Sequence, residues 1–211
     1  MLNCRQRGAS VVEFMVATAV SLVLIAAMLH MFAVSSRTVA VQNGAARLHH
    51  QLNAAATVIT RDIRRAGYWG QAESAMNSGR YQNPFGTAEL DTATCVLLKY
   101  DRDQDGVEAT TETERYGFSL VNGTVKAYVP GAAFNCTATS WINLTDPDIV
   151  EVTEISFTKE DRIIYLNGAS GAGARIRTVV LTMTGRLRSS PDVVHTIRAA
   201  SRLRNDWIQQ S

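Results

Sequence analysis

Acidic residues in one polar stretch have the spacing of a calcium-binding loop. In DRDQDGVEATTE, residues 101–112, positions one, three, five, six and twelve are Asp101, Asp103, Asp105, Gly106 and Glu112. Carboxylate oxygens suit a hard cation such as Ca²⁺, and a glycine at position six permits the sharp turn. One interpretation is therefore a calcium site made by the four acids, which would stiffen the loop rather than drive catalysis.

The flanks of this acidic stretch favour a second interpretation. CVLLKY, residues 95–100, and residues 113–121 are both predicted to be strands, whereas the helix–loop–helix calcium motif has a helix on each side. The acids would then lie at a solvated hairpin tip and bind no metal. No cofactor is required by the sequence, and both interpretations stay open.

No group of residues indicates an enzyme. No serine or cysteine has the histidine and acid context of an activated nucleophile. The glycine-rich GASGAGAR, residues 168–175, lacks the lysine and the spacing of a phosphate-binding loop, so we expect a hairpin loop there. We therefore expect a protein that is not an enzyme.

One carboxylate, Glu13, lies at the start of a long apolar run. From Phe14 to Ser36 there is no Lys, Arg, Asp or Glu, so the run is long enough to cross a bilayer. An acid inside hydrocarbon costs about 2.5–3.5 kcal/mol even on the lenient insertion scale. Arg5 and Arg7 precede the run and favour a cytoplasmic N-terminus, with translocation of the chain beyond the run. Glu13 either has a charged partner or snorkels to the headgroups.

The N-terminal residues resemble the class III signal of type IV prepilins. RGASVVEFMVA, residues 7–17, has a basic leader ending in Gly8, a new N-terminus at Ala9 and Glu13 as the fifth mature residue. The resemblance implies that a prepilin peptidase cleaves after Gly8 and that Ala9 is N-methylated. It also implies that Glu13 meets the N-terminal ammonium of a neighbouring subunit in a filament, because a buried charge is tolerated when it is paired.

Two further stretches resemble the PilW type of minor pilin. They are RDIRRAGYWG, residues 61–70, and IRAASRLRND, residues 197–206. The resemblance implies a structural subunit that primes pilus assembly, with the prepilin peptidase and other minor and major pilins as partners. It implies a single-pass inner-membrane precursor with a periplasmic C-terminal domain, which later joins an extracellular pilus.

Other functions share parts of this pattern. A minor pseudopilin of a type II secretion system would have the same N-terminal signal, and a membrane-tethered periplasmic enzyme is the most distant alternative. A pilus-associated module could bind calcium through the acidic stretch or DNA through arginines. From Gly168 onwards there are seven arginines against two acids, which indicates a solvated face or a surface for acidic subunits or DNA phosphates. These arginines are at positions 175, 177, 186, 188, 198, 202 and 204.

The residue pattern predicts one long helix before a β-rich domain. No proline interrupts residues 9–66, and an apolar stripe recurs at spacings of three and four. The stripe consists of Leu48, Leu52, Ala55, Ile59, Ile63 and Ala66. We expect a leader (1–8), an apolar half of the helix (9–36), an amphipathic half (37–66) and a head domain (67–211).

The head domain is predicted to contain an antiparallel sheet covered by the helix stripe, giving an α+β, type IV pilin-like fold. The expected strands are 95–100, a hairpin over 115–129 that turns at Asn122-Gly123, 150–158 paired with 163–166, 175–187 and 193–205.

Cysteine usage indicates where the head domain resides. Cys4 precedes the apolar run, whereas Cys95 and Cys136 lie in the polar remainder. If that part is exported, the two form a natural disulfide pair, and closing a loop of about 40 residues would stabilise it by about 4 kcal/mol. The alternative is two unpaired thiols.

Overall fold

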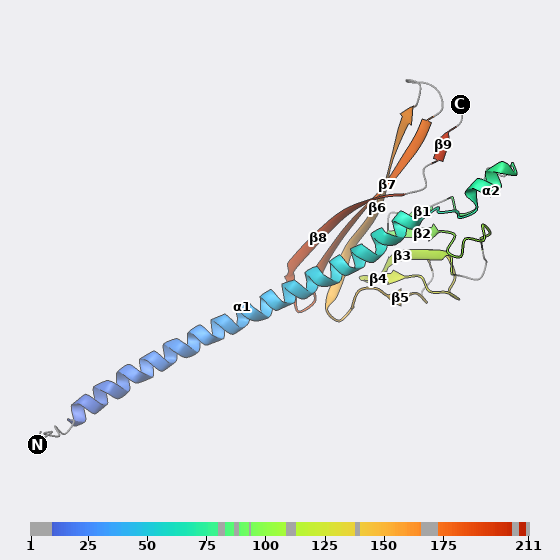
Figure 1. The fold of residues 1–211 in the computed structure, drawn as a ribbon. Coiled ribbons are helices and arrows are strands. Elements are labelled where there is room, and N and C mark those ends of the chain that lie inside the picture. The colour runs from blue at the N-terminus through green and yellow to red at the C-terminus, as the bar shows by residue number, and fades with distance from the viewer. Residues whose placement is uncertain are drawn as a thin grey trace, which may run out of the picture. The chain divides into compact units, whose positions relative to one another are not determined.

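The computed structural model describes residues 10–79, 83–86, 89–92, 94–108, 113–137, 140–165, 173–203 and 207–209. The chain divides into two compact units, Met1–Asn43 and Gly44–Ser211, each of which is described by itself. The helices are α1 (Val11–Arg65) and α2 (Ala72–Asn77), as Figure 1 shows. The strands are β1 (Glu89–Thr92), β2 (Cys95–Lys99), β3 (Arg115–Val121), β4 (Thr124–Ala127), β5 (Ile142–Asn143), β6 (Val150–Tyr165), β7 (Gly173–Leu187), β8 (Ser190–Arg202) and β9 (Trp207–Gln209).

Helix α1 forms as one uninterrupted element, as the absence of proline predicted. In the first unit, all side chains from Ser10 to Asn43 are exposed, including large apolar ones such as Phe14 and Phe32. By length and composition α1 could cross a membrane. The helix ends just before Gly67, whose φ of 75° takes the chain out of the helical conformation.

The strands form two antiparallel sheets where the sequence pattern suggested one. The first has the order β1-β2-β3-β4-β5, and the second has the order β6-β7-β8 with β9 also paired to β7. The predicted turn at Asn122-Gly123 joins β3 to β4, with Val121 opposite Thr124 and positive φ values of 51° and 74° at the turn residues.

The prediction that 150–158 and 163–166 form two paired strands is wrong. Residues 150–158 and 163–165 lie in the single strand β6, which pairs along its length with β7, so that Ile163 lies opposite Arg175. Leu166 lies outside the described residues. The polar residues between the two apolar runs, 159–162, are exposed. They do not end the strand, because the ladder is made by backbone groups rather than by side chains.

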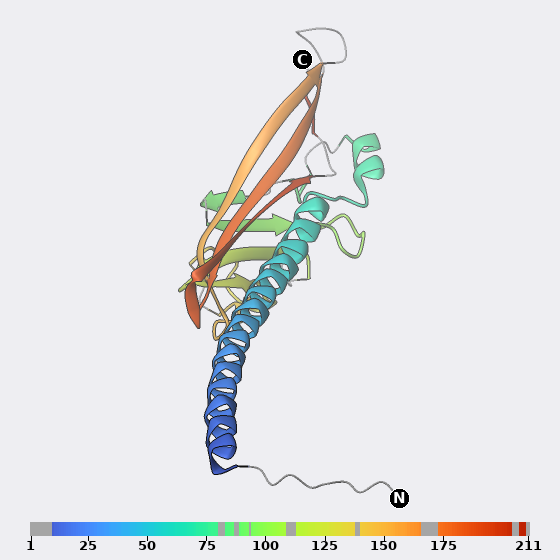
Figure 2. The ribbon, with the colours of Figure 1, turned by 90° about the vertical axis from the view of Figure 1, so that its left-hand side faces the viewer.

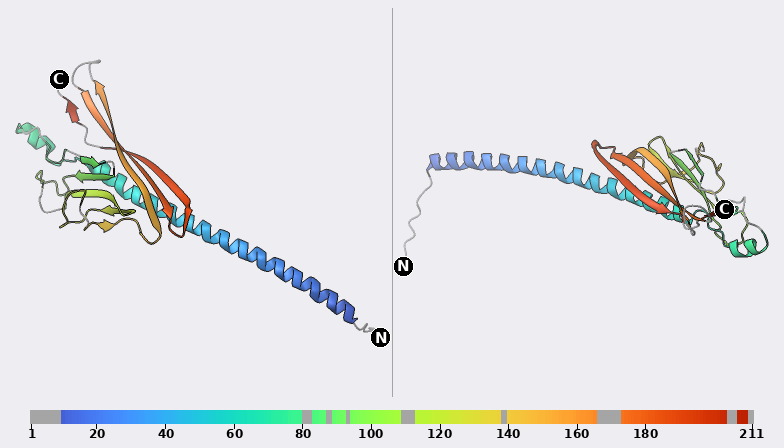
Figure 3. Two further views of the ribbon diagram at one scale, coloured as in Figure 1. Left: turned by 180° about the vertical axis from the view of Figure 1, so that it is seen from behind. Right: turned by 90° about the horizontal axis from the view of Figure 1, so that it is seen from above.

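The main core lies in the second unit, between the later part of α1 and both sheets. Residues of α1 from Leu48 onwards pack with apolar residues of β2, β3, β4, β6 and β7, so the predicted stripe does cover the sheets. Figures 2 and 3 show this part of α1, in cyan, running alongside the strands. Leu52 is fully buried and packs closely on Gly185 of β7, where an added Cβ would lie 3.1 Å from Cδ2 of Leu52.

Candidate functional site

The first candidate site is the N-terminal end of α1. Glu13 is exposed in the first turn of the helix, where a carboxylate also interacts favourably with the helix dipole. No ion pair to Glu13 occurs within the described residues, so a cationic partner would have to come from elsewhere. Gly8 and Ala9, the predicted cleavage and methylation positions, lie outside the described residues.

The second candidate site is a cluster of carboxylates after β2. Ligand oxygens of Asp101, Asp103, Asp105 and Glu114 all lie within 4.8 Å of one another. Asp103 and Asp105 are exposed, whereas Asp101 is 1% and Glu114 0% exposed. Glu112, the acid that the twelve-residue spacing predicted, lies outside the described residues. Glu114 was not identified from the sequence, although it stands two residues further on.

This acidic loop is bound to the chain that follows α1. Oδ2 of Asp101 accepts hydrogen bonds from the backbone N–H groups of Gly70 (2.9 Å) and Gly106 (3.1 Å). The N–H of Asp101 donates to the carbonyl of Tyr68 at 2.9 Å, and the indole N–H of Trp69 donates to the carbonyl of Gly106 at 3.3 Å. Residues 68–70, which follow α1, therefore hold the acidic loop by hydrogen bonds.

Basic side chains on the flanking strands form a separate ion-pair network. Lys99 at the end of β2 and Arg115 at the start of β3 both bind Glu108, with N–O distances of 3.1 and 3.0 Å. Arg115 also lies over the ring of Phe134, 5.4 Å from its centroid. The charge of Glu108 is thus matched within the hairpin.

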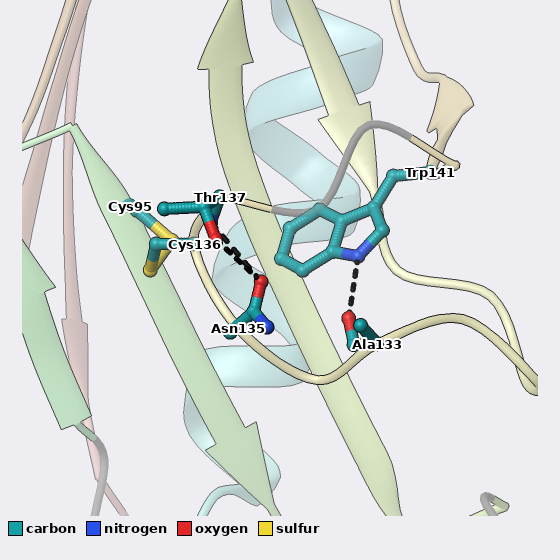
Figure 4. Close-up of a disulfide and its surroundings, with 6 residues drawn as sticks. All are labelled: Cys95, Ala133, Asn135, Cys136, Thr137 and Trp141. Carbon is teal, nitrogen blue, oxygen red and sulfur yellow. Dashed lines mark hydrogen bonds between the residues drawn. A yellow bond between two sulfur atoms is a disulfide. The ribbon is translucent and has the colours of Figure 1, made fainter.

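A disulfide between Cys95 and Cys136 joins β2 to the segment before β5 (Figure 4). Cys95 is buried and packs with Trp141, whose indole N–H donates to the carbonyl of Ala133 at 3.2 Å. The predicted pairing of these two cysteines is therefore present. It anchors a segment that otherwise has little regular secondary structure of its own.

Most described arginines of the C-terminal region serve intramolecular contacts. Arg177 is buried and donates to the carbonyl of Gly86, Arg186 forms a two-bond ion pair with Glu151, and Arg188 donates to a backbone carbonyl. Arg198 and Arg202 are exposed on β8. Arg204 and the side chain of Arg175 lie outside the described residues, so the predicted surface for acidic subunits or DNA is only partly described.

Comparison with known proteins identifies a family. A family model described as prepilin peptidase-dependent protein B matches residues 42–203. This range includes α1 from Gln42 onwards, the acidic loop and strands β1 to β8, but not Gly8, Ala9 or Glu13. No curated protein and no solved structure shows a significant match.

Proposed function

The chain belongs to the family of prepilin peptidase-dependent protein B, a pilus-related family, and from this premise we propose that it is a minor pilin of a type IV pilus. In this proposal it is a structural subunit of the PilW type that primes pilus assembly and has no catalytic role. The family supports dependence on a prepilin peptidase, and the N-terminal residues supply a signal of the matching kind.

One observation supports this proposal most strongly, namely the contrast between the two units of the chain. The unit Gly44–Ser211 has a buried apolar core, formed by α1 from Leu48 onwards and both sheets, whereas the apolar residues of α1 before Asn43 are exposed. Contiguous apolar surface is unfavourable in water by about 25 cal/mol per Å². Such a segment requires lipid or other apolar helices, and a pilin meets these two environments in turn.

Glu13 would then act at the step between membrane and filament. Cleavage after Gly8 would create an ammonium group at Ala9, which N-methylation leaves positively charged. In the filament, Glu13 of one subunit would bind the ammonium of the next, and the pair would set the stagger between subunits. Before assembly, the precursor would be anchored once in the inner membrane with its head in the periplasm.

Replacement of Glu13 tests this proposal. Glu13→Gln is expected to leave membrane insertion intact, because it removes a charge from an apolar segment, and to reduce the amount of the protein in sheared pili. Glu154→Gln, on the exposed face of β6, is the matched control and is expected to change neither. Co-purification of the wild-type protein with secretion components instead of pilins would favour the pseudopilin alternative.

A further inference from the structure

One buried oxygen of Asp101 lacks a partner. The side chain is almost fully buried and uses Oδ2 to accept two backbone hydrogen bonds, whereas Oδ1 has no hydrogen-bond partner among the described residues. A buried acceptor without a partner costs folding free energy, and such atoms are rare in folded proteins. The position of Asp101 therefore indicates a ligand for Oδ1.

The surroundings of Asp101 are crowded with carboxylates. Ligand oxygens of Asp103, Asp105 and Glu114 share the same small volume, and Glu114 is fully buried with one oxygen accepting from the N–H of Arg102 at 3.2 Å. Ionised carboxylates at this separation repel one another. The neighbouring cations Lys99 and Arg115 both bind Glu108.

We infer that Asp101, Asp103, Asp105 and Glu114 form a binding site for a calcium ion. The donor set consists of carboxylate oxygens, with no histidine or cysteine, which suits a hard cation and disfavours zinc. Four carboxylates supply most of the six to eight oxygens that Ca²⁺ takes, whereas Mg²⁺ prefers fewer carboxylates and more water. The last acid comes from the residue before β3 because the loop returns to a strand.

The ion would fasten the loop to the end of α1. Asp101 contacts the ion through one oxygen and holds Gly70 and Gly106 through the other, so metal and backbone share one carboxylate. The loop also meets Gln71, whose side-chain amide donates to the carbonyl of Gln104 at 3.0 Å. Calcium would therefore stabilise the contact between the residues that follow α1 and the loop that follows β2 of the first sheet. This inference does not depend on the role of the protein in a pilus.

Thermal unfolding of the full chain in detergent tests the site. We expect that calcium at ten times its dissociation constant raises the midpoint of the calcium-free protein by about 4 °C, and that equal magnesium raises it far less. The titration should extend into the millimolar range, because extracellular calcium modules bind with constants of about 10⁻⁴–10⁻³ M. No calcium-dependent rise in the wild-type protein would overturn the inference.

Two double variants separate binding at this cluster from a general effect of charge. Asp103→Asn with Asp105→Asn removes two of the four negative charges of the cluster but keeps an oxygen at each position and the bonds to the N–H groups of residues 105 and 107. Asp146→Asn with Asp148→Asn is the matched control, because Asp146 makes the same kind of bond to Asp148 outside the cluster. We expect the first pair to shift the calcium-dependent rise in midpoint to a clearly higher calcium concentration and the second pair to leave it unchanged. Equal calcium responses in the two would contradict the site.

Terbium luminescence gives an independent measurement. Tb³⁺ occupies calcium sites and is sensitised by a nearby indole, and Trp69 is bonded to the loop at Gly106. We expect strong tryptophan-sensitised emission that calcium displaces and that Trp69→Phe greatly reduces, while calcium still raises the unfolding midpoint of that variant. Undiminished emission in Trp69→Phe would place the lanthanide elsewhere and contradict the assignment.

Discussion

The indole N–H of Trp69 donates a hydrogen bond to the carbonyl of Gly106, 3.3 Å away and 37 residues later in the chain. Trp69 follows the C-terminus of α1, and Gly106 is the sixth residue of the acidic loop. Together with the bonds of Asp101 to residues 68 and 70, this contact fixes the loop to the end of the helix. The conformation of the loop and that of the helix terminus therefore depend on each other.

The close approach of Gly70 to this loop predicts a specific steric effect. A Cβ at Gly70 would lie 2.8 Å from Cβ and 3.0 Å from Cα of Gln104. Gly70→Ala is therefore expected to lower the free energy of unfolding by about 1–3 kcal/mol, as overpacking does. Chemical denaturation of the head measures the change.

Gln104→Gly provides the matched test of that contact. It removes the Cβ that meets residue 70 and suits the φ of 65° at position 104. We expect the double variant to recover part of the stability lost in Gly70→Ala, so that the two changes are not additive. Strict additivity would show that the two residues do not interact.

Removal of the disulfide is expected to weaken the head domain. The Cys95–Cys136 bond closes a loop with a sequence separation of 41. On the chain-entropy account, replacing both cysteines by serine lowers the free energy of unfolding by about 4 kcal/mol. Urea denaturation with and without reductant measures this. Reductant should destabilise the wild-type protein to a similar extent and leave the stability of the double variant unchanged. A wild-type protein whose stability does not change in reductant would contradict a role for this bond.

Substitutions along α1 are expected to differ between its two parts. Leu52 is fully buried against the sheets, whereas Leu24 is exposed in the apolar segment. Leu52→Ala should therefore lower the free energy of unfolding of the head by about 2–5 kcal/mol. Leu24→Ala is the matched control and should change it by less than about 0.5 kcal/mol. Similar losses in both variants would contradict the confinement of the core to residues after Asn43.

Asp62 gives the stability of the head a predictable dependence on pH. Burial raises the pKa of Asp62 above its ordinary value of 3.8, and the adjacent Arg61 opposes this only in part. The folded state therefore holds the proton more strongly than the unfolded state does. Between pH 3.8 and the higher folded pKa, the contribution of this carboxyl to stability therefore falls as the pH rises.

Asp62→Asn tests this effect because an amide does not titrate in this range but still accepts the bond from Arg61. The free energy of unfolding of the variant minus that of the wild-type protein should increase as the pH rises from 4 through the folded pKa of Asp62. Because the other acids are the same in both proteins, their titration cancels in this difference. Unfolding curves over a pH series measure the difference. A difference that does not change with pH would contradict the raised pKa.

The elements with a regular pattern were predictable from the sequence. The stripe from Leu48 to Ala66 has helical spacing, and Asn122-Gly123 stands between two apolar runs, so α1 and the β3–β4 hairpin were both predicted. The short strands β1, β5 and β9 were not. They have two to four residues, and their place is set by pairing with a neighbouring strand rather than by their own apolar pattern.

The acidic site was predictable only in part. The spacing of Asp101, Asp103 and Asp105 identified the loop. The twelve-residue spacing then predicted Glu112 as the last acid, but that spacing applies to a loop that is followed by a helix. Here the chain returns to a strand, with the N–H of Tyr100 donating to the carbonyl of Glu114 at 3.1 Å. Pairing with β2 thus brings Glu114 beside Asp101, and no local spacing encodes that contact.

We propose that the chain is a substrate of a prepilin peptidase and enters a pilus by its N-terminal helix. Intact mass of the protein from cells with and without that peptidase tests it most directly. We expect a product that starts at Ala9, carries one added methyl group and lacks two hydrogens because of the Cys95–Cys136 bond. An uncleaved chain in peptidase-positive cells would contradict the claim and leave Glu13 without its proposed partner.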